Sequence, residues 1–222
     1  MPATLTLGCN SYTLNPSDSP VQATYSGADW YITTKDCNPI EHTSVLASEA
    51  PDQNLIFEVD VIGLSANVST GANGDGQDRL LFKGNVTRST VVTGNPISQA
   101  GDSVSFERSV TLSTITTSVK NDTVLFASSS TAGTTVNLGA GIDSISFTSI
   151  NKVEASTVIN LGRADRSIDT VSVAAKSTFQ GAGVVINNFE VGRDVLLAPN
   201  TVIRNQSEAN AYFGSGSVTL NS

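Results

Sequence analysis

Histidine and cysteine are almost absent from this sequence, which has one histidine (His42) and two cysteines (Cys9 and Cys37) in 222 residues. A lone histidine without a CxxC pair cannot supply the four ligands of a structural zinc site, so zinc is not expected. Two cysteines are also too few for a disulfide framework. The sequence leaves two states of this pair open, a Cys9–Cys37 bridge and two free thiols.

Charge is scarce as well: 14% of the residues are charged, and the formal net charge is −8 at pH 7. The lysines and arginines are scattered, whereas a nucleic-acid surface needs them clustered, so no nucleic-acid partner is expected. No run of about 18 apolar residues occurs, so no membrane partner is expected either. The first residues, MPATLTLGCN, have neither the basic nor the apolar region of a signal peptide, and we expect no cleaved leader.

Aromatic residues and prolines divide the chain near residue 51. The only tryptophan, three of four tyrosines and five of seven prolines lie before residue 52, whereas all eight phenylalanines lie after residue 56. Such a shift in composition marks a domain boundary, and runs such as VQATY and DWYITT indicate short strands. We therefore predict a β-rich cap or attachment region at residues 1–50. Its Trp30 and Tyr31 are candidates for a subunit interface, with the core of this region as the alternative.

A degenerate repeat fills residues 51–204. Six segments begin with an aspartate, and apolar residues follow two and four positions later almost every time. These aspartates are Asp78, Asp102, Asp122, Asp143, Asp169 and Asp194. Their spacings are 24, 20, 21, 26 and 25 residues, and a second apolar run such as STVVTG, STITTS or NTVIRN closes each unit. Alternation with period two predicts two short strands per unit, each with one buried face.

The repeat predicts an all-β fold, a parallel β-solenoid of about seven rungs and roughly 34 Å in length. A two-stranded unit cannot bury its apolar face alone, but stacked copies can. Residues 205–222 are expected to form a capping strand, which protects the last rung from pairing with other chains. An antiparallel β-sandwich is the alternative fold. It is less favoured because it requires no recurrence of the same residue types at matching offsets.

Stacking would bring the six aspartates into one column, and like charges about 5 Å apart repel each other. The column therefore needs compensation. Amide groups of the turns can supply it, because an aspartate that opens a strand readily accepts hydrogen bonds from turn amides. The cations beside these turns are the other candidates: Arg79, Lys120, Arg166 and Arg193.

Two stretches, GDGQDRLLF at residues 74–82 and GAGIDSISF at residues 139–147, resemble the GGxGxDxUx nonapeptide of RTX, or haemolysin-type, calcium-binding repeats. The matching positions include Gly76 and Asp78 in the first stretch and Gly141 and Asp143 in the second. The resemblance implies a parallel β-roll in which these glycines form turns and these aspartates bind calcium. Calcium is the only cofactor that the sequence suggests, and turn chemistry alone is the competing interpretation.

Catalytic patterns are missing. A glycosidase needs two carboxylates in a cleft, usually with aromatic platforms, but Glu107, Glu154, Asp165 and Glu190 are isolated in sequence and the repeat region has no tryptophan. GxSxG, GxGxxG and Walker A motifs are absent too. We therefore expect no enzymatic activity.

The function expected is that of a non-enzymatic structural protein on an assembly, most simply a bacteriophage virion component. It would be attached to other subunits through residues 1–50, with a homo-oligomer also open. Its acidic, lysine-poor, degenerate β repeats are similar in style to marine phage structural proteins. The alternatives are a secreted, extracellular calcium-binding protein of the RTX type and a polysaccharide-binding fibre.

Overall fold

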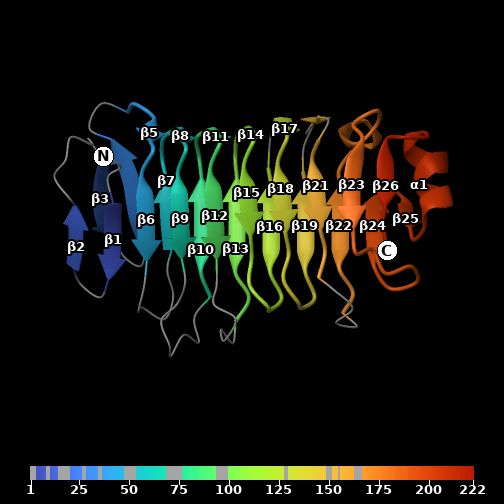
Figure 1. Ribbon diagram of the computed structural model, residues 1–222, viewed down its shortest axis with the longest axis horizontal. Helices are drawn as coiled ribbons and strands as arrows, with labels where there is room; N and C mark the ends of the chain where they lie inside the picture. The colour runs from blue at the N-terminus through green and yellow to red at the C-terminus, as the bar shows by residue number, and fades with distance from the viewer. Residues whose placement is uncertain are drawn as a thin grey trace.

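The computed structural model describes residues 4–8, 11–14, 21–26, 29–34, 37–47, 54–68, 77–93, 100–127, 130–148, 152–154, 156–162 and 167–222. Within these ranges the chain forms the predicted parallel β-solenoid, with about six complete three-strand turns where the repeat predicted about seven rungs. The strands follow one another along the long axis of the molecule, from the first strands to the single described α-helix (Figure 1).

Three sheets run along this axis. Sheet A has ten strands, in the spatial order β2 (Ser11–Leu14), β1 (Thr4–Gly8), β6 (Ser44–Ala47), β9 (Ser65–Val68), β12 (Thr90–Thr93), β15 (Thr114–Thr116), β18 (Thr135–Asn137), β21 (Val158–Asn160), β23 (Val184–Asn187) and β26 (Val218–Leu220). Sheet B has ten strands, in the order β25 (Thr201–Ile203), β24 (Val195–Ala198), β22 (Thr170–Val173), β19 (Ser144–Phe147), β16 (Thr123–Phe126), β13 (Ser103–Phe106), β10 (Arg79–Phe82), β7 (Asn54–Phe57), β4 (Asp29–Thr34) and β3 (Val21–Ser26). Sheet C has six short strands, in the order β20 (Lys152–Val153), β17 (Ser130–Ala132), β14 (Val110–Thr111), β11 (Val86–Thr87), β8 (Val61–Ile62) and β5 (Ile40–Glu41).

Each coil takes one strand from sheet B, then one from sheet C, then one from sheet A. Coil 1 is β4–β6, and coils 2 to 6 continue in threes up to β19–β21. All pairings between coils are parallel and in register, so that Leu80 of β10 lies between Leu55 and Val104. A seventh coil replaces its sheet C strand by a 3-10 turn, η1 (Lys176–Thr178).

The structure differs from the sequence-based description in the number of strands per unit and in where the coils begin. Each of coils 1 to 6 has a third strand in sheet C, which the sequence did not indicate because two residues such as Val86–Thr87 are too short to show alternation. Parallel stacking already includes β4, which pairs with β7. The repeat therefore begins near residue 29, within the segment that composition separates as residues 1–50.

The core is organised as columns of equivalent side chains. In the sheet B strands of coils 2 to 6, one phenylalanine per strand points inward, and consecutive rings stack with centroids 4.6 to 5.2 Å apart; they are Phe57, Phe82, Phe106, Phe126 and Phe147. Coil 7 has Val173 at this position, and Phe179 packs edge-on against Phe147 instead. Burying a side chain of this size contributes about 2–3 kcal/mol, so the column is a main source of coil-to-coil stability.

The turn from sheet C to sheet A explains why the second strand of most units is led by serine or threonine. The residue before this leading position has a positive φ of 46–70° in coils 1 to 6: His42, Gly63, Arg88, Leu112, Gly133 and Ser156. In every one of these coils except coil 2, which has Leu64, a buried hydroxyl follows and bonds to the backbone. For example, Ser113 Oγ donates to the carbonyl of Thr111 and accepts from the N–H of Ser89 in the previous coil.

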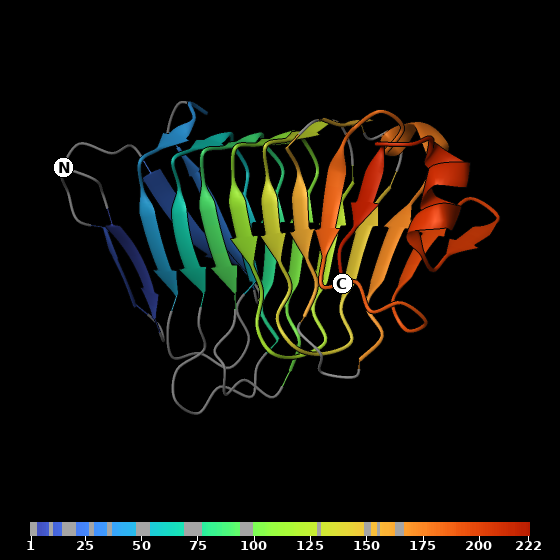
Figure 2. The ribbon, with the colours of Figure 1, turned by 45° about the vertical axis from the view of Figure 1, so that its right-hand side comes forward.

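The C-terminal end of the solenoid is closed by a helix and a hairpin (Figure 2). Helix α1 (Gln206–Phe213) begins at the N-cap Asn205, whose side chain accepts from the N–H of Glu208, and it buries Ala209 and Phe213 against the core. Strand β25 turns back antiparallel onto β24. The expected capping strand exists as β26, but the expectation missed α1, and the NTVIRN run forms this hairpin and does not continue sheet A.

The exposed edge of β26 is covered by one side chain. Gln206 donates from Nε2 to the carbonyl of Val218 and accepts at Oε1 from the N–H of Leu220, at 2.9 and 2.7 Å. These two backbone groups face away from β23, because bonding groups alternate along a strand. The amide of Gln206 therefore replaces a neighbouring strand and protects the edge from pairing with another chain.

Candidate functional site

The six repeat aspartates form one buried ladder, as the sequence predicted. Each stands just before a sheet B strand and is at most 3% exposed. From the second aspartate onward, each accepts at Oδ1 from the backbone N–H of the equivalent aspartate in the previous coil. The N–O distances are 3.0, 2.7, 2.7, 2.9 and 2.9 Å along the series Asp78, Asp102, Asp122, Asp143, Asp169 and Asp194. Backbone amides thus provide part of the compensation that the column requires.

Asp194 is the last aspartate of the ladder, and it also bonds to Glu190 in its own turn. Its Oδ2 accepts from the N–H of Glu190, and its own N–H donates to the carbonyl of Glu190. Arg193, one of the cations expected to compensate the column, pairs instead with Glu190 at 3.4 Å. Arg166, another such cation, lies outside the described residues.

Burial of the ladder changes its protonation. Burial raises the pKa of Asp102 to about 6, although the N–H of Asp78 opposes the shift. Burial also raises the pKa of Asp122, against the N–H of Asp102 and the hydroxyls of Thr117 and Ser118. The amide bonds therefore offset only part of the cost of removing these carboxylates from water.

The two RTX-like stretches place Asp78 and Asp143 in this same ladder, in coils 3 and 6. Asp102 and Asp122 stand between them, so the two aspartates do not face each other across neighbouring coils. Oδ1 of Asp143 is engaged by the N–H of Asp122. No group of three His, Cys, Asp or Glu side chains suited to a metal ion occurs within the described ranges.

The glycines of the second stretch have a packing reason. Gly139 lies so close to the carbonyl of Ser118 in the previous coil that no Cβ would fit. Gly141 has a φ of +136°, and a Cβ there would be 2.5 Å from the carbonyl oxygen of Lys120. Close approach of neighbouring turns therefore accounts for glycine at both positions, and Gly76 of the first stretch lies outside the described residues.

The structure separates the two aromatic residues proposed for an interface. Trp30 of β4 points inward and is 9% exposed, so it belongs to the core of coil 1. Tyr31 points outward and is half-buried. The Lys83 ammonium lies 6.0 Å from the centroid of its ring.

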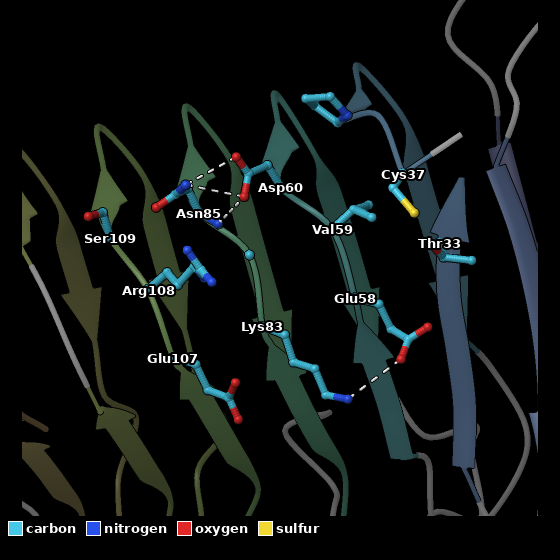
Figure 3. Close-up of a pocket in the computed structure, with 12 residues that line it drawn as sticks. Thr33, Cys37, Glu58, Val59, Asp60, Lys83, Asn85, Glu107, Arg108 and Ser109 are labelled. Atoms are coloured by element: carbon cyan, nitrogen blue, oxygen red, sulfur yellow. Dashed lines mark hydrogen bonds and ion pairs between the residues drawn. The ribbon is translucent and has the colours of Figure 1, made fainter. Parts of the chain in front are cut away.

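A polar groove of about 1030 Å³ lies where sheet B turns into sheet C, across coils 1 to 4. We call it the corner groove, and Figure 3 shows its side chains in successive coils. Its lining residues are Thr33, Cys37, Pro39, Glu58, Val59, Asp60, Lys83, Gly84, Asn85, Glu107, Arg108 and Ser109.

Two polar pairs cross between neighbouring coils in the corner groove. Lys83 Nζ lies 3.5 Å from Glu58 Oε1. Asn85 donates to Oδ1 of Asp60 from its backbone, at 2.7 Å, and from Nδ2 to both carboxylate oxygens, at 3.2 and 3.1 Å. These pairs hold the groove's side chains in defined positions before any ligand arrives.

Among these groove residues, the sequence drew attention only to Glu107, as an isolated carboxylate, and to Cys37, which is a free and exposed thiol in the structure. A usable pattern was present: Glu58, Lys83 and Glu107 each follow the inward phenylalanine of their unit. Aligning the units on phenylalanine therefore places them in one row on the same corner of the solenoid. The chemistry available there is polar recognition by charged and amide groups.

No helix among the described residues is long and apolar enough to cross a membrane. No family model, curated protein or solved structure matches this chain. Its function must therefore be argued from its own residues.

Proposed function

We propose that the protein is a non-enzymatic structural component displayed on an assembly, most simply a bacteriophage virion protein such as a decoration, fibre or appendage subunit. The observation that carries this proposal is the uninterrupted stacking of the coils. The phenylalanine column joins coils 2 to 6 and the aspartate ladder begins at coil 3, so a bend between coils 3 and 6 must disturb both of them together with the parallel sheets. A stiff rod suits a part that projects from a particle.

The two ends of the rod differ in a way that supports attachment through residues 1–50. At the C-terminal end, α1 and the Gln206 side chain cover β26, the last strand of sheet A, while sheet B finishes in β25, which pairs antiparallel with β24. At the other end, sheets A and B finish in β2 and β3, and within the described residues no further strand pairs with either. A strand edge that has no neighbouring strand among the described residues can pair with a strand of another subunit, and we infer that other structural subunits, or further copies of this chain, bind there.

The outward positions of sheet A also fit a durable external role. The column that begins at Thr90 continues in register through Thr114 and Thr135, and Asn137, Asn160 and Asn187 are joined by side-chain hydrogen bonds of 2.6 and 2.7 Å. These are uncharged groups that bond along the rod. Such a surface changes little with salt or pH, as a particle exposed to varying media requires.

Mass spectrometry and immunogold electron microscopy of gradient-purified particles test the proposal. We expect the chain at a fixed ratio to other virion proteins, with gold label on the particle surface. Its recovery as a free protein in particle-free culture medium would instead favour a secreted protein, and its exclusion from particles would refute the virion assignment.

A calcium titration separates the proposal from the RTX alternative. Proteins of that type depend on calcium to fold, whereas each ladder aspartate from Asp102 onward already accepts a backbone N–H at Oδ1 without a metal ion. We expect the circular dichroism spectrum and the unfolding midpoint to be the same in calcium and in EDTA. A chain that unfolds in EDTA and refolds with calcium would support the RTX interpretation.

A further inference from the structure

The corner groove is built from three rows that run along the rod axis. Successive coils lie about 4.8 Å apart, and backbone bonds hold the corners in register: the N–H of Lys83 donates to the carbonyl of Phe57, and that of Glu107 to Phe82. One row is Glu58, Lys83 and Glu107, the middle row is Val59, Gly84 and Arg108, and the third row is Asp60, Asn85 and Ser109.

Gly84 leaves the middle row without a side chain in coil 3. A Cβ at this residue would overlap the backbone of Val59 and Asp60, so coil 3 packs directly against coil 2 at this corner. The floor between Val59 and Arg108 therefore has no side chain. Figure 3 shows Arg108 extending from coil 4 toward coil 3, between the levels of Asn85 and Lys83.

The walls of the groove are preorganised for hydrogen bonding. Lys83 is held between Glu58 and the Tyr31 ring, and Asn85 is held by Asp60. These groups retain donors and acceptors for a ligand, because an ammonium has three N–H groups and each carboxylate oxygen has two lone pairs. Holding them in place reduces the entropy lost on binding.

The charges and the shape of the groove define the class of ligand. Acidic and basic groups alternate along the first row, so the row does not present charge of a single sign to a ligand. The net charge of −8 on the protein also disfavours the binding of polyanions. Val59 and Pro39 are the main apolar groups of the lining, too few to anchor an apolar peptide. A ligand that suits such a channel is linear, uncharged and rich in hydroxyl groups.

We propose that the corner groove binds a neutral polysaccharide chain lying along the rod axis, with Arg108, Asn85 and Asp60 in contact with its hydroxyl groups. This inference does not depend on where the protein is located. On a displayed rod, the groove would recognise a glycan of the surface that the assembly meets.

An array of neutral and acidic polysaccharides, incubated with the full-length protein, provides the first test. We expect retention on one or more neutral glycans and none on polyuronates or sulfated chains. Binding to acidic chains alone, or to no glycan at millimolar concentration, would overturn the proposal.

Calorimetric titration of the retained glycan into variants locates the site. Arg108→Ala and Asn85→Ala, which remove two of the proposed contacts, are expected to weaken binding at least tenfold. Arg79→Ala is the matched control, because Arg79 is an exposed arginine of coil 3 that lies on the outer face of sheet B. Thermal unfolding followed by circular dichroism checks that each variant is folded. Wild-type affinity in both groove variants, or an equal loss in Arg79→Ala, would place the glycan elsewhere and refute the proposal.

Discussion

The carboxylate of Asp122 accepts a hydrogen bond from the backbone N–H of Asp102 in the previous coil, with 2.7 Å between Oδ1 and N. Ser118 Oγ donates to the same carboxylate at 3.2 Å. The same hydrogen bond repeats along the ladder. Each aspartate from Asp102 onward accepts from the backbone N–H of the equivalent aspartate in the previous coil.

Two substitutions of Asp122 distinguish the effect of its ladder hydrogen bond on stability from the effect of its buried charge. Asp122→Asn keeps an oxygen that can accept from the N–H of Asp102 and removes a buried charge, so we expect it to be at least as stable as the wild type at pH 7.5. Asp122→Ala leaves that N–H buried without an acceptor, and should be about 1–3 kcal/mol less stable than the Asn variant. Urea denaturation of the two variants measures the difference. Equal stabilities would show that the ladder bond contributes nothing.

Stability should fall as pH rises from 4.5 to 8. Asp102 has a folded-state pKa of about 6, above its usual value of 3.8, so the folded state binds the proton more tightly than the unfolded state. The resulting stability is complete below pH 4 and is lost as pH rises through 6, with a total on the order of 2–3 kcal/mol. The raised pKa of Asp122 acts in the same direction.

Asp102→Asn is the control for this pH dependence, because the net negative charge of the protein also decreases in acid. The free energy of unfolding, measured in urea at several pH values, should vary less in this variant than in the wild type. An identical pH profile in both proteins would contradict a role for Asp102.

Gly139→Ala tests the close approach of neighbouring turns. The added Cβ would overlap the carbonyl of Ser118, so the turn must move away from the previous coil, and we expect a loss of about 2–4 kcal/mol. Gly181→Ala is the comparison, because Gly181 has a φ of +70° but a Cβ added there would have no atom within 4 Å. The loss of stability in Gly181→Ala should come only from placing an alanine in the left-handed backbone conformation, which costs about 1–2 kcal/mol. Thermal melts that rank the two variants in the reverse order would argue against the packing explanation.

Gln206→Ala should expose the edge of β26. The carbonyl of Val218 and the N–H of Leu220 lose their side-chain partner, so the last strand can pair with another chain. Analytical ultracentrifugation is expected to show concentration-dependent association. Gln180→Ala, at an exposed turn residue, should sediment as the wild type does. Unchanged sedimentation of Gln206→Ala would mean that other groups protect this end.

Sequence periodicity located the sheet B and sheet A strands of the repeat well, because a buried face requires an apolar residue at every second position. The pairs Leu80 and Phe82, and Val104 and Phe106, are buried as this rule requires. Periodicity did not predict the strands of sheet C, because strands such as Val86–Thr87 are too short to show alternation. It did not predict helix α1 either, because this helix is defined by its cap at Asn205 and by contacts with the end of the core.

The sequence by itself determined the fold class and the aspartate column, because both follow from residue types that recur at fixed offsets and stacking converts each offset into a column. Only the tertiary structure decided what the column does, which residues line the corner groove and why glycine occupies position 139. Those properties depend on the distance between coils that are 20 to 26 residues apart in the chain. Spacing along a sequence identifies the neighbours of a turn but does not measure how closely their backbones approach.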